Sequence, residues 1–157
     1  KKMKKYFNII VILFLAICCS SCLDANLEEL DTYEGKEITG VVGVYHRYYD
    51  DSYIHNGSGE QAVKQANLSV ADILIDKEGG TCTFSVSVPG NFPKGEAEKV
   101  SSQALVVIVN ISTAAIVSPI EGAPQFGKPG DWSKPNRYKV KAANGDEQIW
   151  TVSLTFK

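Results

Sequence analysis

The last quarter of the chain, residues 129–156, carries the pattern that most restricts the fold. Apolar residues alternate with polar ones from Tyr138 to Ala142, and again from Trp150 to Phe156. Asn144-Gly145 lies between the two runs, and Asn-Gly is the commonest pair in a two-residue type I′ hairpin turn, although a loop one or two residues longer also fits. One face of the predicted hairpin is apolar, so a second sheet is needed to cover it.

Strand-like segments also precede the hairpin. They are rich in β-branched and aromatic residues or alternate between apolar and polar ones, and they cover residues 38–50, 61–76, 81–88, 105–111 and 113–118. We expect a break near Ser69, a central strand at 105–111 because this run is apolar on both faces, and a strand end at Pro119. Residues 51–59 and 89–99 have the glycine, proline and asparagine content of loops.

These segments predict an all-β domain over residues 37–157. About seven short strands without a long helix favour an immunoglobulin-like antiparallel β-sandwich, with a small barrel as the alternative. Tyr138, at the start of a late strand, resembles the tyrosine corner of immunoglobulin-like domains.

Side-chain directions follow from the alternation. Cys82, Phe84, Val86 and Val88 are expected to point inward, which makes Cys82 a buried core residue rather than a reactive thiol. In the first strand Val42, Val44, His46 and Tyr48 would share one face, and the glycines at 40 and 43 indicate a bulge.

The first 21 residues are typical of an export signal. Four lysines precede a short apolar run, Ile9 to Ile17, and Ser20-Ser21-Cys22 follows. Small residues before a cysteine are typical of a bacterial lipoprotein signal, so Cys22 is the predicted lipidation site; ordinary cleavage near Ser20 is the alternative. Several acyl chains hold a protein stably on a bilayer, which makes the membrane a predicted partner through this anchor.

Removing the signal changes the charge of the chain. The whole sequence has 16 basic and 18 acidic residues, and because four lysines precede Cys22, 12 basic residues remain against 18 acidic ones, a net charge of −6. This charge argues against a nucleic-acid partner.

Residues 22–36 are acidic, and this composition predicts a tether between the anchor and the domain. Acidic residues after the lipid cysteine resemble a surface-export signal of Bacteroidetes lipoproteins, so we expect the outer-membrane surface, with a periplasmic-facing position as the alternative.

One segment, residues 45–55, is dense in polar and aromatic side chains. Tyrosine rings stack on sugar faces, and neighbouring charged groups bond to sugar hydroxyls. The candidate glycan-binding residues are Tyr45, Arg47, Tyr48, Tyr49, Asp50 and Tyr53, with Trp132 as a further candidate from a Gly/Pro loop. The plainer interpretation is a strand with tyrosines at the core margin and a tryptophan packed over the end of the sandwich.

Other chemistry has little support in the sequence. His46, Asp50, Asp51 and His55 match no established metal-ligand spacing, so no metal site is predicted. No nucleophile motif or phosphate-binding glycine loop is present, and no cofactor is expected. We therefore expect a protein that is not an enzyme.

Three stretches resemble a known family. Asn110 to Ala115, the loop from Gly130 to Pro135, and Tyr138 to Gly145 with Trp150-Thr-Val152 are similar to the immunoglobulin-like domain of Bacteroidetes lipoproteins of unknown function. Such proteins often accompany polysaccharide-utilisation systems. The resemblance implies a fold and a location, and it transfers no catalytic residue.

Two functions remain as expectations. The first is an envelope-anchored accessory lipoprotein that binds a polysaccharide. The second is a structural or adhesive module that binds an outer-membrane protein, through an exposed strand edge for example.

Overall fold

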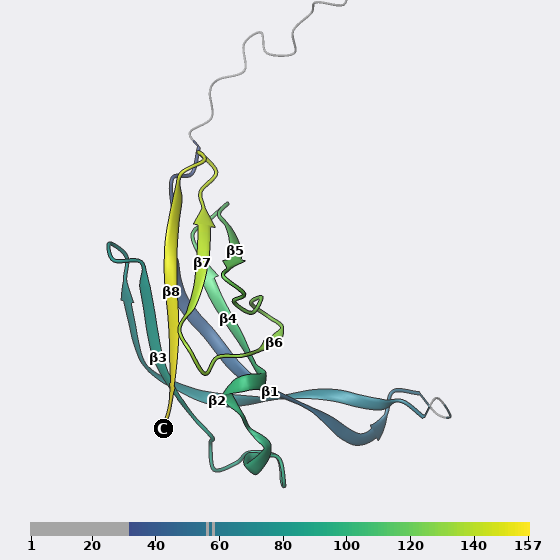
Figure 1. The fold of residues 1–157 in the computed structure, drawn as a ribbon. Helices are drawn as coiled ribbons and strands as arrows, with labels where there is room; N and C mark the ends of the chain where they lie inside the picture. Colours follow the sequence, from purple (N-terminus) through teal and green to yellow (C-terminus); the bar gives the residue numbers. More distant parts are fainter. Residues whose placement is uncertain (1–31, 56, 58) are drawn as a thin grey trace, which may run out of the picture. The chain divides into compact units, whose positions relative to one another are not determined.

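The computed structural model describes residues 32–157 except positions 56 and 58. Residues 1–31, with the predicted signal and Cys22, lie outside the described residues. The compact body spans Thr32–Lys157. Its elements are β1 (Ile38–Tyr53), β2 (Gln61–Asp76), β3 (Thr81–Ser87), the 3-10 turns η1 (Ala97–Lys99) and η2 (Ser102–Ala104), β4 (Leu105–Ile111), β5 (Ile116–Ile120), β6 (Pro129–Gly130), β7 (Asn136–Lys141) and β8 (Glu147–Phe156) (Figure 1).

The strands form one curled, mixed sheet in the order β5-β7-β8-β3-β2-β1-β4-β6. The all-β class is confirmed. The expected arrangement differs in two respects: eight strands are paired rather than about seven, and β3 and β8 run parallel, with Thr81 opposite Thr151 and Val86 opposite Phe156. Alternation along a strand determines which side chains face inward, but it does not specify the neighbouring strand or its direction.

Both long strands change partner along their length. β1 pairs with β4 from Ile38 to His46 and with β2 from Val44 to Tyr53. β2 pairs with β1 up to Leu68 and with β3 from Ser69 onward, so the break predicted near Ser69 is a change of partner within a continuous strand. These shared strands join both halves, so all eight strands belong to one hydrogen-bonded sheet, and the predicted immunoglobulin-like sandwich is not confirmed.

Beyond the point where β4 ends, β1 and β2 leave the body as a two-stranded ribbon (Figure 1). We call this ribbon, residues 47–53 of β1 and 61–65 of β2, the arm. Residues 51–53, which were predicted as part of a loop, belong to β1. The pairing is irregular between Tyr49 and Tyr53, so the arm is bulged toward its tip.

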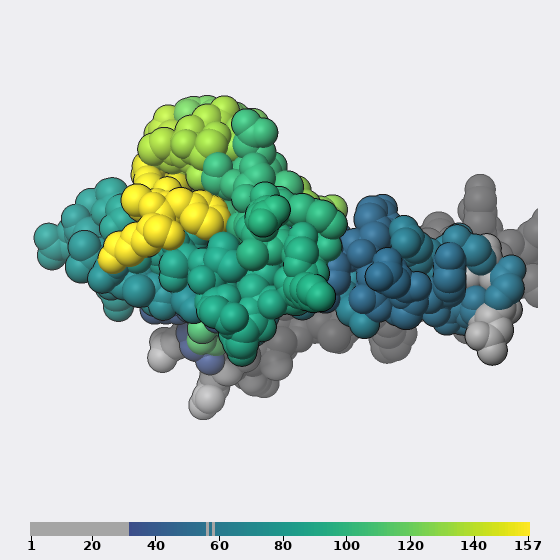
Figure 2. Space-filling view, turned by 90° about the horizontal axis from the view of Figure 1, so that it is seen from below, coloured from purple at the N-terminus to yellow at the C-terminus, as the bar shows by residue number. Residues whose placement is uncertain are grey.

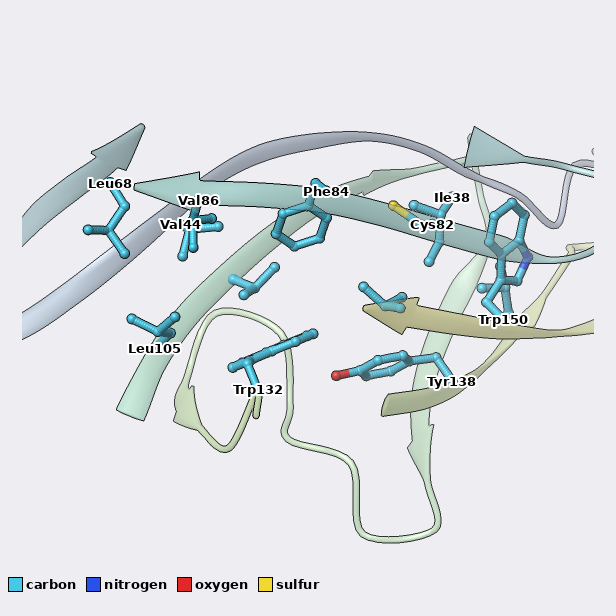
Figure 3. Close-up of a cluster of buried hydrophobic side chains, with 13 residues drawn as sticks. Ile38, Val44, Leu68, Cys82, Phe84, Val86, Leu105, Trp132, Tyr138 and Trp150 are labelled. Atoms are coloured by element: carbon cyan, nitrogen blue, oxygen red, sulfur yellow. The ribbon is translucent and has the colours of Figure 1, made fainter. Parts of the chain in front are cut away.

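The core lies inside the curled sheet and contains the predicted face of the C-terminal hairpin (Figure 3). Tyr138, Val140, Trp150 and Val152 are fully buried. The indole Nε1 of Trp150 donates a hydrogen bond to the carbonyl of Lys36 at 2.9 Å, so burying the ring leaves its polar atom satisfied.

Two further predictions concern buried polar groups, the Cys82 thiol and the Tyr138 hydroxyl. Cys82 is buried as expected, and burial raises the pKa of its thiol to about 11, which keeps it protonated. The Tyr138 hydroxyl donates to the carbonyl of Pro124 at 2.8 Å. This is the type of hydrogen bond a tyrosine corner makes, here to a residue 14 positions upstream.

The hairpin turn is longer than the two-residue alternative. The amide of Ala142 donates to the carbonyl of Asp146 at 2.8 Å, which leaves Ala143, Asn144 and Gly145 as the loop. Gly145 has a φ of 98°, whereas a type I′ turn needs a positive φ at Asn144 too. The turn is therefore a three-residue connection that relies on glycine at its last position.

The loop from 121 to 132 covers one edge of β4, the strand that was expected to be central because it is apolar on both faces. β4 pairs with β1 along its length, but on its other side it meets only the two residues of β6. There the amide of Gly127 donates to the carbonyl of Val107 at 2.9 Å, so this loop covers the edge of β4. The apolar residues Leu105 to Val107 are buried without a full second neighbour.

Two other strand predictions are corrected. β5 begins at Ile116 and includes Pro119, which an edge strand tolerates because the missing N–H faces no partner. Val42 is 52% exposed instead of facing inward with Val44. The register shifts between Val41 and Gly43, as the glycines indicated, and this bulge moves Val42 to the outer side.

The end of the predicted tether, residues 32–36, contacts the body. The carbonyl of Tyr33 accepts a hydrogen bond from the amide of Asn144 at 3.2 Å. The Lys36 amine lies 3.3 Å from the Asp146 carboxylate. The domain therefore begins about five residues before the expected start at Glu37, because its first residues bond to the turn of the hairpin.

Candidate functional site

A groove lies where the arm leaves the body. One wall is the run from Tyr48 to Asp51 in β1, and the other is Pro93 to Glu96 with Lys99, from the connection between β3 and β4. Its volume is about 370 Å³. We call it the tyrosine groove. Figure 2 shows this connection, in green, between the C-terminal end of β8, in yellow, and the arm, in blue.

The connection is folded by successive turns. The amide of Phe92 bonds to the carbonyl of Pro89, that of Glu96 to Pro93, and that of Lys99 to Glu96, each at 3.1 Å. Gly95 supplies the positive φ of 78° that precedes Glu96. Because these bonds are local, the loop presents Glu96 and Lys99 to β1 as one unit.

Glu96 attaches this loop to β1. Its carboxylate accepts a hydrogen bond from Lys99 at 2.8 Å and lies 3.3 Å from Nε2 of the buried His46. The bond from Lys99 holds the pKa of the Glu96 carboxyl below its usual range; burial opposes this and His46 supports it. Because the ionised carboxylate only accepts hydrogen bonds, Nε2 of His46 carries the proton.

The two tyrosines of the groove face opposite sides of the arm, as adjacent residues in a strand do. The ring of Tyr48 is parallel to that of His46, within 6°, with centroids 6.2 Å apart. Tyr49 is 71% exposed and lies opposite Val63 of β2. It also borders a second hollow of about 240 Å³, whose walls include Arg47, Val63 and Pro129. Tyr49 therefore offers an open aromatic ring at the junction of a polar and an apolar hollow.

Asp50 is held by the neighbouring strand. Its carboxylate lies 2.5 Å from the Lys64 amine and accepts a hydrogen bond from the Ser52 hydroxyl. The bond from Lys64, followed by that from Ser52, lowers the pKa of Asp50 to about 2. Asp51, the next residue, is exposed on the groove wall.

The structure brings four of the predicted glycan-binding residues together: Arg47, Tyr48, Tyr49 and Asp50 line the two hollows. Tyr45 does not line them. A side chain at Gly43 would meet the Tyr45 ring at 3.1 Å, so this ring lies back over the body. Tyr53 is 60% exposed but lies further out on the arm.

The assignment of Trp132 to a binding surface is corrected. Its side chain is 1% exposed and packs against Phe126 and Tyr138, with ring centroids 5.8 and 6.2 Å away. Figure 3 shows Trp132 beside Tyr138 in the core. The plainer interpretation, a tryptophan packed into the end of the core, describes its position, because a buried ring has no face left for a sugar.

The second wall of the groove could not be predicted from the sequence. Lys94, Glu96 and Lys99 come from a segment that the sequence predicts only as a Pro/Gly loop, and nothing in the sequence pairs His46 with that loop. The charges of this loop were visible, but its position against a strand 50 residues earlier depends on the tertiary fold.

Within the described part of the chain, no three metal-ligating side chains converge. Over the same residues, no helix has the length and apolar character needed to cross a membrane. The groove offers an open aromatic ring, Tyr49, beside carboxylates and lysines, which suits hydrogen bonding to a polar ligand.

Comparison with known proteins identifies the family of the chain. The chain belongs to the DUF5018-related family, whose model matches residues 38–153, and this span includes β1 to β7, most of β8 and both walls of the tyrosine groove. No protein with a curated description matches the chain.

A solved structure is also similar. It is the crystal structure of a candidate secreted protein from Bacteroides fragilis NCTC 9343, with 42% identity and a TM-score of 0.69, and the match covers 81% of this chain and 99% of that one. The two proteins therefore share their fold, and the description of the Bacteroides protein is consistent with a location outside the cytoplasm.

Proposed function

We propose that this protein is a glycan-binding accessory lipoprotein of the cell envelope, with its ligand in the tyrosine groove. The observation that carries the proposal is Tyr49, whose ring is 71% exposed next to a groove lined by carboxylates and lysines. Sugar rings stack on such an aromatic face while their hydroxyls bond to the charged groups beside it.

Binding to a panel of purified polysaccharides, measured by affinity electrophoresis and titration calorimetry, tests this function. Tyr49→Ala is expected to weaken binding at least about tenfold, because one stacked aromatic ring contributes on the order of 1.4 kcal/mol. Tyr33→Ala is the matched control, since Tyr33 is 59% exposed but lies outside the groove. No binding to any polymer, or equal losses in both variants, would contradict the proposal.

The location is part of the proposal. We place the protein on the outer membrane, facing the cell surface, through a lipid on Cys22, supported by the signal pattern of the sequence and by the secreted description of the Bacteroides protein. Cys22→Ala should abolish incorporation of labelled fatty acid, whereas Cys19→Ala should not. Protease treatment of intact cells should cut the domain if it faces outward; a periplasmic-facing domain would be protected.

A protein-binding module is the second candidate, and one feature of the arm favours it. Residues 47–53 of β1 have no described strand partner on the side where β4 ends, so their backbone groups are available to another strand. The bulge and the two aspartates of this segment oppose edge pairing, which is why the glycan function ranks first. Capture of one specific outer-membrane protein, together with absence of glycan binding, would favour this second function.

A further inference from the structure

A second hollow lies beside the first part of the connection between β3 and β4. Its walls are residues 65–69 of β2 and, from the connection, Pro89 and residues 91–93, and its volume is about 380 Å³. We call it the amide groove. Exposed amide and hydroxyl side chains come from both walls: Gln65, Asn67, Ser69 and Asn91. None of the described residues that line it carries a charge, whereas charged residues line much of the tyrosine groove.

The polar side chains of the amide groove are free to bond to a ligand. Gln65, Asn67 and Ser69 are alternate residues of β2, so they point to the same side of the strand. Within the described part of the chain, neither these side chains nor that of Asn91 makes a hydrogen bond. An amide offers donors and an acceptor together, and a hydroxyl is likewise both donor and acceptor. The groove can therefore bind a row of hydroxyls without separating any ion pair.

The two grooves are held together by shared residues. Pro93 borders both of them. The ring centroid of the buried His46 lies 6.1 Å from that of Phe92, which lines the amide groove. Nε2 of the same histidine lies 3.3 Å from the carboxylate of Glu96, which lines the tyrosine groove. Because one buried side chain contacts both walls, the two grooves keep a fixed spacing that an extended ligand can span.

Resting on the proposed glycan function, we infer that the amide groove is a second subsite for the same polysaccharide chain. One sugar stacks on Tyr49 at the tyrosine groove, and units further along the chain pass Pro93 and bond through their hydroxyls to the amides of Gln65, Asn67 and Asn91. The preferred ligand is therefore a segment of several consecutive sugar units rather than a single sugar.

Fragments of different length test whether one chain spans both grooves. The polysaccharide that binds most tightly in the panel is partly digested, and its fragments are sorted by size. Affinity is expected to rise at least about tenfold once a fragment is long enough to occupy both grooves, because the second contact is then intramolecular. Equal affinity for the shortest and the longest fragments would overturn the inference.

Two asparagine variants test the amide groove itself. Asn67→Ala should weaken binding of the long fragments about fivefold, the effect of one hydrogen bond. Binding of the shortest fragments, which occupy the tyrosine groove alone, should not change. Asn110→Ala is the matched control, because Asn110 is also exposed on a strand but lines neither groove, and it should leave both affinities unchanged. Gln65→Ala gives a second test if Asn67→Ala does not fold.

The outcomes separate this inference from the proposed function. If a polymer binds, but the long fragments bind equally to the wild type, Asn67→Ala and Gln65→Ala, the second subsite is wrong while the glycan function stands. If no polymer binds, the proposed function fails and the second subsite fails with it. If the two variants instead lose a specific outer-membrane protein, the amide groove binds protein and the inference is wrong.

Discussion

The two halves of β1 contrast sharply. Residues 38–46 pair with β4 and bury Ile38, Val44 and His46 in the body. Residues 47–53 pair with β2 alone and expose Tyr49 and Tyr53 by 71% and 60%. One continuous strand thus contributes to the stable core at one end and to the candidate binding surface at the other. Stability and binding should therefore respond to different substitutions.

The largest expected loss of stability comes from a substitution in the core of the body. Trp150→Ala removes a fully buried ring and its hydrogen bond to the carbonyl of Lys36, so it should lower the free energy of unfolding by about 3 to 5 kcal/mol. Chemical unfolding measures this loss. Ile149→Ala, at a 38% exposed neighbour, should cost about 1 kcal/mol or less. A loss below about 1 kcal/mol for Trp150→Ala would show that the ring does not support the core.

The next comparison uses two glycines with positive φ. A side-chain carbon at Gly80 would lie 2.4 Å from the carbonyl oxygen of Ile149, whereas one at Gly57, near the tip of the arm, would meet nothing within 4 Å. Gly80→Ala should therefore cost about 3 kcal/mol, because it combines a strained φ with a backbone clash, and Gly57→Ala about 1 kcal/mol. Thermal unfolding of both variants tests the difference, and equal losses would contradict the contrast between body and arm.

The hairpin and the groove differ in how much of their structure could be predicted from the sequence. The inward positions of Tyr138 and Trp150 were predictable because alternation is a local property of the chain. The groove was half predictable, since Tyr48, Tyr49 and Asp50 form one dense segment. Glu96 and Lys99 were not, because their approach to His46 requires the loop to fold against a strand that is distant in the sequence.

The parallel pairing of β3 with β8 also could not be predicted from the sequence. Both strands alternate, and either would be compatible with an antiparallel neighbour. The burial of Trp132 was a true ambiguity, because a tryptophan in a Gly/Pro loop has the same sequence signature whether it packs inward or lies open.

A smaller effect on stability is expected for the arm. Tyr49→Ala should change the free energy of unfolding by no more than about 0.5 kcal/mol, because the ring is mostly exposed. A clear loss of glycan binding without a loss of stability would sharpen the division of β1 into two halves. If Tyr49→Ala unfolds the protein, the tyrosine is part of the core margin and the division is wrong.

The smallest expected effect is a change in the pKa of the Asp50 carboxyl. Because Asp50 has a lowered pKa, its pairing with Lys64 stabilises the arm fully above its ordinary pKa of 3.8, and this contribution is lost as the pH falls toward about 2. Lys64→Gln should shift the carboxyl pKa of Asp50 upward toward 3.8, measured by carbon NMR. Lys128→Gln, elsewhere on the surface, should leave it unchanged. An Asp50 pKa that does not move would show that another group holds it.

The parallel pairing of β3 with β8 has a consequence for the order of folding. Strands β1 to β3 form one local meander and β7 with β8 another, and the sheet joins the two through the pairing of β3 with β8, from Thr81 opposite Thr151 to Val86 opposite Phe156. Closing a loop of this size costs entropy before the pairing rewards it, so proteins rich in such contacts fold in milliseconds to seconds rather than in microseconds. During synthesis the meander of β1 to β3 has to wait for nearly the whole chain before its open edge is covered.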